Sequence, residues 1–255
     1  MHGSLFQVGG APVFGMLFFM SLGFVLALYF AIERGLEEIP GIDPRHPFNI
    51  AAIICVAGIA GSRIFFVAEA WDHYRVHLDE IPRFWEGGLS FYGGLAFASA
   101  GGLAYVLATG LPLLVILDLT RYIAYGHLVG RVGCLLEGCC YGKPTDGPFG
   151  LCLPTVAGDS LRRYPTQIFE FAGLVVLFTG LDLLARSPRR PPRGSLFGLY
   201  LIGYGTLRLG LEALRDDMVG PTYAGLHRYQ WASVLAIAAG VLNLAWLRVR
   251  AAPAR

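Results

Sequence analysis

Long apolar runs separated by short polar stretches dominate this chain. A helix that crosses a bilayer core requires about 20 predominantly apolar residues. Seven runs of about this length cover residues 12–32, 48–70, 89–109, 111–130, 168–185, 195–214 and 229–247. The pattern predicts an all-α integral membrane protein of seven transmembrane helices around a polar cavity, which form one membrane domain over residues 1–255.

The first and fourth runs need separate interpretation. The run from Pro12 to Ile32 is longer than the ~7–15 apolar residues of a signal-peptide core, and no basic region precedes it, so we expect it to remain as a transmembrane helix. The fourth run contains Asp118, Arg121 and His127. Because such groups are tolerated at bilayer depth only away from lipid, this run is either a helix that lines a polar cavity or a re-entrant element.

The composition agrees with a membrane protein and argues against a nucleic-acid partner. Hydrophobic residues make up 55% of the chain and charged residues 15%, whereas a soluble domain has roughly 25% charged residues. The net charge is only +2, and the arginines lie at the ends of segments rather than along one face. We therefore expect membrane lipid, and no polyanion, as a partner.

The distribution of arginines predicts an orientation. The densest basic cluster lies in the loop 186–194 and comprises Arg186, Arg189, Arg190 and Arg193, and the tail adds Arg248, Arg250 and Arg255. In a bundle of seven helices both groups lie on one side, which the positive-inside rule assigns to the cytoplasm. The amino terminus and a long loop over residues 131–167 are then expected outside.

Two sets of polar residues share a helical face inside the apolar runs. Tyr204, Arg208, Glu212 and Arg215 are spaced four, four and three residues apart, and His127 precedes Arg131 by four. One interpretation is a purely structural pair of Arg208 with Glu212. The other is a site for an anionic headgroup, because a guanidinium matches phosphate oxygens with a fixed fork of donors.

Glycines are dense in GGLSFYGGL at 87–95 and in GRVGCLLEGCCYG at 130–142. In membrane helices glycine most often permits close packing of backbones. Each run also abuts a boundary between polar and apolar sequence, where a bent backbone can direct its N–H groups at a phosphate. Both interpretations stay open on the sequence.

Four of the five cysteines, Cys134, Cys139, Cys140 and Cys152, lie within nineteen residues. No CxxC pair is present and His127 is the only nearby histidine, so the spacing is poor for zinc. If the loop faces an oxidising compartment, disulfides persist there. We therefore expect Cys139 or Cys140 to pair with Cys152 and expect no metal, with a zinc site as the alternative.

Four motifs follow one another in a recognisable order: GGLSFYGGL (87–95), GHLVGRVGCLLEGCCYG (126–142), YPTQIFE (164–170) and GLYLIGYGTLRLGLEALRDD (198–217). In sequence and spacing they resemble the successive motifs of the bacterial prolipoprotein diacylglyceryl transferases. GSRIFFV (61–67) and GLHRYQWAS (225–233) also look similar, so the resemblance covers almost the whole chain. Its most specific part is GRxG at 130–133 followed by YxxxRxxxExxR at 204–215.

The resemblance implies a seven-helix enzyme of the bacterial cytoplasmic membrane that needs no cofactor. It implies transfer of the diacylglyceryl group of phosphatidylglycerol to a cysteine thiol of a prolipoprotein, with Arg131 and Arg208 binding the phosphate. Substrate-binding roles are implied for further residues of the matched motifs: Gly93, Gly94, Gly130, Gly133, Cys134, Glu137, Gln167, Glu170, Tyr204, Glu212 and Arg215.

The chain departs from the family pattern at consequential places. Tyr92 replaces the histidine of the family's SFHGG motif, Cys134 and Glu137 stand where asparagines are expected, and Phe14 replaces a tyrosine. A tyrosine, whose pKa is ordinarily ~10, is a poor general base at neutral pH. Either Tyr92 orients substrate by a hydrogen bond, or His127 acts as the base. The alternative is a diverged relative that binds phospholipid or modifies a different acceptor.

Overall fold

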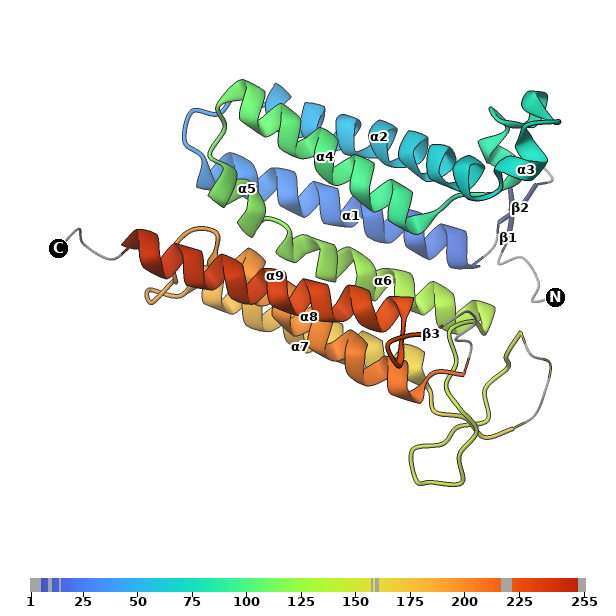
Figure 1. Cartoon of the computed structure of the whole chain (residues 1–255). Helices are drawn as coiled ribbons and strands as arrows, with labels where there is room; N and C mark the ends of the chain where they lie inside the picture. Colours follow the sequence, from blue (N-terminus) through green and yellow to red (C-terminus); the bar gives the residue numbers. More distant parts are fainter. Residues whose placement is uncertain are drawn as a thin grey trace. The chain divides into compact units, whose positions relative to one another are not determined.

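The computed structural model describes residues 6–8, 11–13, 15–156, 158, 161–216 and 222–251. The α-helices are α1 Gly15–Glu38, α2 Arg45–Glu69, α3 Trp71–Tyr74, α4 Phe91–Thr109, α5 Leu113–Asp118, α6 Arg121–Glu137, α7 Thr166–Arg186, α8 Ser195–Leu214 and α9 Arg228–Ala251. There are also two short 3-10 helices, η1 Leu78–Glu80 and η2 Phe84–Glu86. Two pairs of antiparallel strands are described: β1 Phe6–Val8 with β2 Ala11–Val13, and β3 Thr222–Tyr223 with β4 Leu226–His227. The protein is therefore an all-α protein with two small hairpins (Figure 1).

Six helices among the described residues are long and apolar enough to cross a membrane: α1, α2, α4, α5 with α6, α7 and α9. The prediction of an all-α integral membrane protein is confirmed. Helix α8 matches the remaining predicted span and has 20 residues, but it is less apolar because Arg208, Glu212 and several tyrosines and glycines interrupt its sequence. Its crossing of the membrane stays a prediction.

Three predicted boundaries were wrong. Helix α1 begins at Gly15 rather than Pro12, because residues 11–13 pair with β1, and it continues to Glu38. Helix α6 extends to Glu137 rather than ending at 130. Helix α7 begins at Thr166, so the long connection covers 138–165 instead of 131–167.

The chain forms two compact units, one of Met1–Ala31 with Leu117–Arg255 and the other of Ile32–Ile116. The prediction of a single membrane domain stays a prediction. In the second unit α2 packs along α4 through glycines (Figure 1). A Cβ added to Gly61 would lie 2.3 Å from the Cβ of Phe97, and one added to Gly93 would lie 2.3 Å from the Cβ of Phe65.

Arg63 of α2, an ionisable residue in an apolar run, organises the loop of the second unit. Its guanidinium donates to the backbone carbonyls of Glu80, Ile81, Gly87 and Gly88 at 2.6 to 3.0 Å. Both glycines have a positive φ, of 100° and 71° respectively. Arg63 therefore ties together backbone carbonyls from two parts of the connection between α3 and α4.

The first unit contains α6, α7, α8 and α9, which lie side by side in that order (Figure 1). Its apolar core includes Leu174 and Leu181 of α7 and Leu196 and Tyr200 of α8. The N-terminal part of α1 contacts α6 through two glycines. A Cβ on Gly23 would lie 2.2 Å from the carbonyl oxygen of Gly126, so neither position admits a side chain without a shift.

The polar residues of the fourth apolar run face the protein interior, as predicted. Asp118 is fully buried, and its Oδ1 accepts from the backbone N–H groups of Leu196 at 3.0 Å and Phe197 at 3.4 Å, which begin α8. Its Oδ2 lies 3.4 Å from Nη2 of Arg190. Asp118 therefore satisfies free donors at a helix N-terminus, which is a structural role.

Candidate functional site

A buried carboxylate joins two arginines from different helices of the first unit. Glu170 of α7 is only 2% exposed. Its Oε1 lies 2.9 Å from Nη2 of Arg131 on α6, and its Oε2 accepts from Nη1 of Arg208 on α8 at 3.1 Å. The sequence places these residues 38 or more positions from Glu170, so only the packing of three helices brings them together.

Further polar groups surround this pair of arginines. Nη2 of Arg208 also contacts Glu212 one turn along α8, as the sequence spacing predicted. Nη2 of Arg131 lies 2.8 Å from Nε2 of His127, and since an arginine can only donate, this histidine nitrogen accepts. The ring of His127 packs edge-on against Tyr204 at 5.3 Å. Two guanidinium groups and two carboxylates therefore form one network.

The arginine network still has a free donor. Arg131 and Arg208 expose only 10% and 14% of their side chains. Within the part of the chain that the structure describes, Nε of Arg131 is buried and has no hydrogen-bond partner. A buried charged donor without a partner is costly, so this N–H group is available to an acceptor that the described residues do not supply.

The connection after α6 is fixed to the start of α7. Gly138, whose φ is +71°, caps the carboxyl end of α6. Thr166 donates through Oγ1 to the carbonyl of Cys140 at 2.6 Å, and Gln167 donates through Nε2 to the carbonyl of Cys139 at 2.7 Å. The implied substrate-binding residue Gln167 is thus engaged in holding the loop.

A second anchor, which the sequence analysis missed, holds the loop to the end of α8. Arg163 is buried and donates from Nη1 to Oδ2 of Asp216 at 2.6 Å and to the carbonyl of Gly142 at 3.2 Å. Its guanidinium also lies 4.8 Å from the ring centre of Tyr141. An arginine in a polar loop has no local pattern that reveals such partners. The backbone of Arg215 forms an isolated bridge with Gly142.

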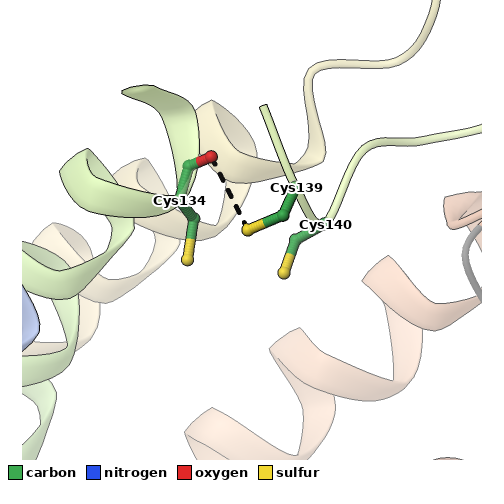
Figure 2. A group of neighbouring side chains, drawn as sticks. All are labelled: Cys134, Cys139 and Cys140. Atoms are coloured by element: carbon green, nitrogen blue, oxygen red, sulfur yellow. Dashed lines mark hydrogen bonds between the residues drawn. The ribbon is translucent and has the colours of Figure 1, made fainter. Parts of the chain in front are cut away.

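The predicted disulfide to Cys152 is not formed, and this expectation was wrong for the structure. All five cysteines are free thiols, and Cys152 is exposed. Instead Cys134 of α6 lies beside Cys139 and Cys140 of the loop, as Figure 2 shows. The three sulfur atoms lie within 4.8 Å of one another. The loop folds back on the helix that precedes it, which the separation in sequence did not indicate.

Three of the four glycines that were expected to bind substrate, Gly93, Gly94 and Gly133, lie at close contacts between helices. Gly93 and Gly94 lie in α4 against α2, and a Cβ on Gly94 would lie 2.3 Å from Oγ of Ser62. Gly130 and Gly133 lie in α6, where a Cβ on Gly133 would lie 2.9 Å from the Cα of Met16. Their contact with a ligand stays a prediction.

The remaining candidates lie at three separate places. Glu137 is the last residue of α6. Tyr92 lies in the first turn of α4, in the second unit, and is half-buried. Phe14 lies outside the described residues. The structure therefore brings together His127, Arg131, Glu170, Tyr204, Arg208 and Glu212, all in the first unit.

Fold and site together define a helical membrane protein with a buried pair of arginines joined by a carboxylate. The sequence model described as prolipoprotein diacylglyceryl transferase matches residues 4–246. The chain belongs to this family, which is a family of transferases.

Similar proteins agree with this assignment. The chain is 34% identical over 233 residues to the phosphatidylglycerol–prolipoprotein diacylglyceryl transferase of Nitrosomonas europaea, which covers 88% of this chain and 82% of that protein. It is 35% identical over 212 residues to the protein of the same name from Cupriavidus pinatubonensis, with 80% and 73% covered. For the one from Nitrosospira multiformis the identity is 31% over 259 residues, with 97% and 86% covered.

Proposed function

We propose that this protein transfers the diacylglyceryl group of phosphatidylglycerol to a cysteine thiol of prolipoproteins in the bacterial cytoplasmic membrane. Membership of the family and the names of the similar proteins support this activity. The observation that carries the assignment to a site is the bridge from Arg131 through Glu170 to Arg208, with the unpartnered Nε of Arg131 beside it.

The chemistry follows from the charge that develops on the leaving group. The acceptor thiolate attacks the glycerol carbon that carries the phosphate ester. A C–S bond forms, the C–O bond breaks, and glycerol phosphate leaves with the electron pair. Arg131 and Arg208 stabilise its negative charge as donors that are already in place. Their positive charge also lowers the pKa of a thiol nearby, which favours the thiolate.

The carboxylates hold the two arginines in position. Glu170 touches both guanidinium groups and Glu212 touches that of Arg208. A guanidinium has five N–H donors, so each arginine retains donors for phosphate while it is paired. Tyr204 lies along the same face of α8 and packs against His127.

The contacts of His127 argue against its proposed role as the base. Its Nε2 accepts from Arg131, so the proton of the neutral ring is on Nδ1. Protonation of Nε2 would break that hydrogen bond and place a second positive charge beside Arg131. We therefore propose that His127 orients Arg131.

The orientation proposed from the sequence accompanies this function. Arg186, Arg189, Arg190 and Arg193 in the α7–α8 connection, with Arg248 and Arg250 at the end of α9, are proposed to face the cytoplasm. The loop 138–165 then lies outside. In a Cys152→Ser background, a cysteine introduced at exposed Asp146 would be labelled from outside by a membrane-impermeant reagent, and the background protein without it would show much less labelling.

The test of this function replaces each arginine. Arg131→Ala and Arg208→Ala should each lower transfer by at least ~100-fold, the effect of losing one preorganised donor to a developing charge. Lysine should restore little, because a point charge lacks the planar fork. The control is Arg186→Ala at the end of α7, which is 57% exposed and pairs with Asp182.

The measurement is transfer of radiolabelled diacylglyceryl from phosphatidylglycerol to a peptide that carries a prolipoprotein acceptor cysteine. Gel filtration in detergent establishes that each variant is folded. Wild-type transfer in a folded Arg131→Ala or Arg208→Ala variant would remove that arginine from the phosphate-binding role. Absence of transfer in the wild type and in the Arg186→Ala control would reject the function itself.

A further inference from the structure

Three thiols at the end of α6 have no part in the proposed transfer chemistry. Cys134 lies in the last turn of the helix, and Cys139 and Cys140 lie in the loop that folds back over it (Figure 2). Every pair among their sulfur atoms is separated by no more than 4.8 Å. Cysteine sulfurs are the ligand atoms that thiophilic metal ions prefer.

Short hydrogen bonds hold the backbone of the two loop cysteines. The N–H of Cys139 donates to the carbonyl of Cys134 at 3.2 Å, and the Sγ of Cys139 lies 3.8 Å from the same oxygen. Thr166 and Gln167 hold the carbonyls of Cys140 and Cys139 from the first turn of α7. The three thiols are therefore presented by a fixed frame rather than by a free loop.

Two backbone features show how closely this frame is built. A Cβ on Gly138 would lie 2.5 Å from the carbonyl oxygen of Pro154, so the turn that leads into the cysteines admits only glycine. Cys140 itself has a φ of 60°, a left-handed conformation that non-glycine residues rarely adopt. Strain of this kind persists where the surroundings enforce it and is frequent at functional sites. Here it turns the Cys140 thiol toward Cys134 and Cys139.

A positively charged guanidinium lies beside the cluster. Nη1 of Arg131 lies 3.8 Å from the Sγ of Cys134. The thiolate is the form of cysteine that ligates metals.

The dimensions of the triangle suit a tetrahedral metal ion. A Zn–S bond length of about 2.3 Å places tetrahedral sulfur ligands about 3.8 Å apart. The widest separation in the cluster therefore needs to contract by only about 1 Å, which side-chain rotation provides. Three protein ligands leave one coordination position open.

Charge selects among thiophilic ions. Three thiolates with a divalent ion leave a net charge of −1, which the neighbouring guanidinium of Arg131 balances. With Cu⁺ the same ligands leave −2. We propose that Cys134, Cys139 and Cys140 bind one Zn²⁺ ion, with the release of their thiol protons, and that the ion ties the end of α6 to the loop that α7 holds.

The first test is direct metal analysis of the whole protein in detergent, purified with reductant, incubated with zinc chloride and passed over a gel-filtration column. We expect one zinc per chain in the wild type and in the controls Cys55→Ser and Cys152→Ser, whose thiols lie outside the cluster. Cys134→Ser, Cys139→Ser and Cys140→Ser should each weaken zinc retention at least 10-fold against a competing chelator.

The second test uses the unaltered protein, so it does not depend on the folding of any variant. Site-resolved alkylation read by mass spectrometry should show that zinc protects the three clustered thiols and leaves Cys152 reactive. Removal of zinc by a chelator should restore their modification. Neither readout depends on diacylglyceryl transfer, so the two proposals fail separately.

Any of the following results would overturn the proposal. They are a zinc-loaded wild type that retains no metal, retention unchanged in Cys139→Ser, binding of Cu⁺ with exclusion of Zn²⁺, and a disulfide between two of the three cysteines in protein purified with reductant. Loss of zinc from Cys152→Ser would also contradict the assignment, because Cys152 is not one of the three ligands.

Discussion

The charge on Glu170 holds Arg131 and Arg208 together, and its removal tests this role most directly. Glu170→Gln keeps the size of the side chain and one carbonyl oxygen. That oxygen can accept from Arg131 or from Arg208, and the new amide group turns N–H donors toward the other guanidinium. One of two contacts, now 2.9 and 3.1 Å long, is therefore lost and two buried positive charges remain.

The expected loss of stability in Glu170→Gln follows from the burial of Glu170, which is 2% exposed. Removal of one partner from a buried pair costs about 3–5 kcal/mol, and the retained oxygen places the loss near the lower limit. A loss of ~3 kcal/mol corresponds to a fall in melting temperature of roughly 6–12 °C in a chain of this size. Misplacement of one arginine should lower transfer by at least ~100-fold, which is about 2.7 kcal/mol in the activation free energy.

The assay combines a melting curve in detergent with radiolabelled transfer to an acceptor peptide, both below the melting temperature of the variant. Asp182→Asn is the matched control, because Asp182 lies on the same helix and pairs with Arg186 and Arg121 away from the site. The control should retain transfer. Wild-type transfer and stability in Glu170→Gln would refute the bridging role.

Two further predictions concern residues outside this network. Tyr92→Phe should slow transfer by ~10–100-fold, the effect of one lost hydrogen bond in the transition state, and an inactive wild type beside an active Tyr92→His variant would show instead that a base is required at this position. Asp118→Ala should lower the free energy of unfolding by about 2–3 kcal/mol, because the donors at the start of α8 and the guanidinium of Arg190 lose this acceptor. The control is Asp146→Ala at an exposed position. Equal melting temperatures of the two variants would contradict the role of Asp118.

The membrane helices could be predicted because their signal is local. Six of the seven apolar runs correspond to helices that are long and apolar enough to cross a bilayer. The remaining run, 195–214, corresponds to the 20-residue helix α8. The common face of Tyr204, Arg208 and Glu212 also followed from helical periodicity alone. The boundaries were less accurate, because the pairing of residues 11–13 with β1 and the extension of α6 depend on contacts that hydropathy does not register.

The members of the site could be named from motifs, but their partners could not. The YPTQIFE motif identified Glu170, and nothing in it indicated that this carboxylate bridges two arginines from other helices. In the same way Arg163 of the loop meets Asp216 only because the loop returns to the end of α8. Ion pairs over such separations are set by how helices pack, since a side chain reaches only a few ångströms from its backbone.

The cysteines show most clearly what the sequence and the tertiary structure each determine. Four of them lie within nineteen residues, and an oxidised pair with Cys152 was a reasonable expectation from this spacing. Tertiary structure decided otherwise, because the turn at Gly138 and the hydrogen bonds from Thr166 and Gln167 direct two loop thiols back to the helix. Sequence determined which segments form long apolar helices and which polar residues share a helical face, because both depend on neighbours along the chain. Only the packed fold decided which of those residues meet, because that depends on neighbours in space.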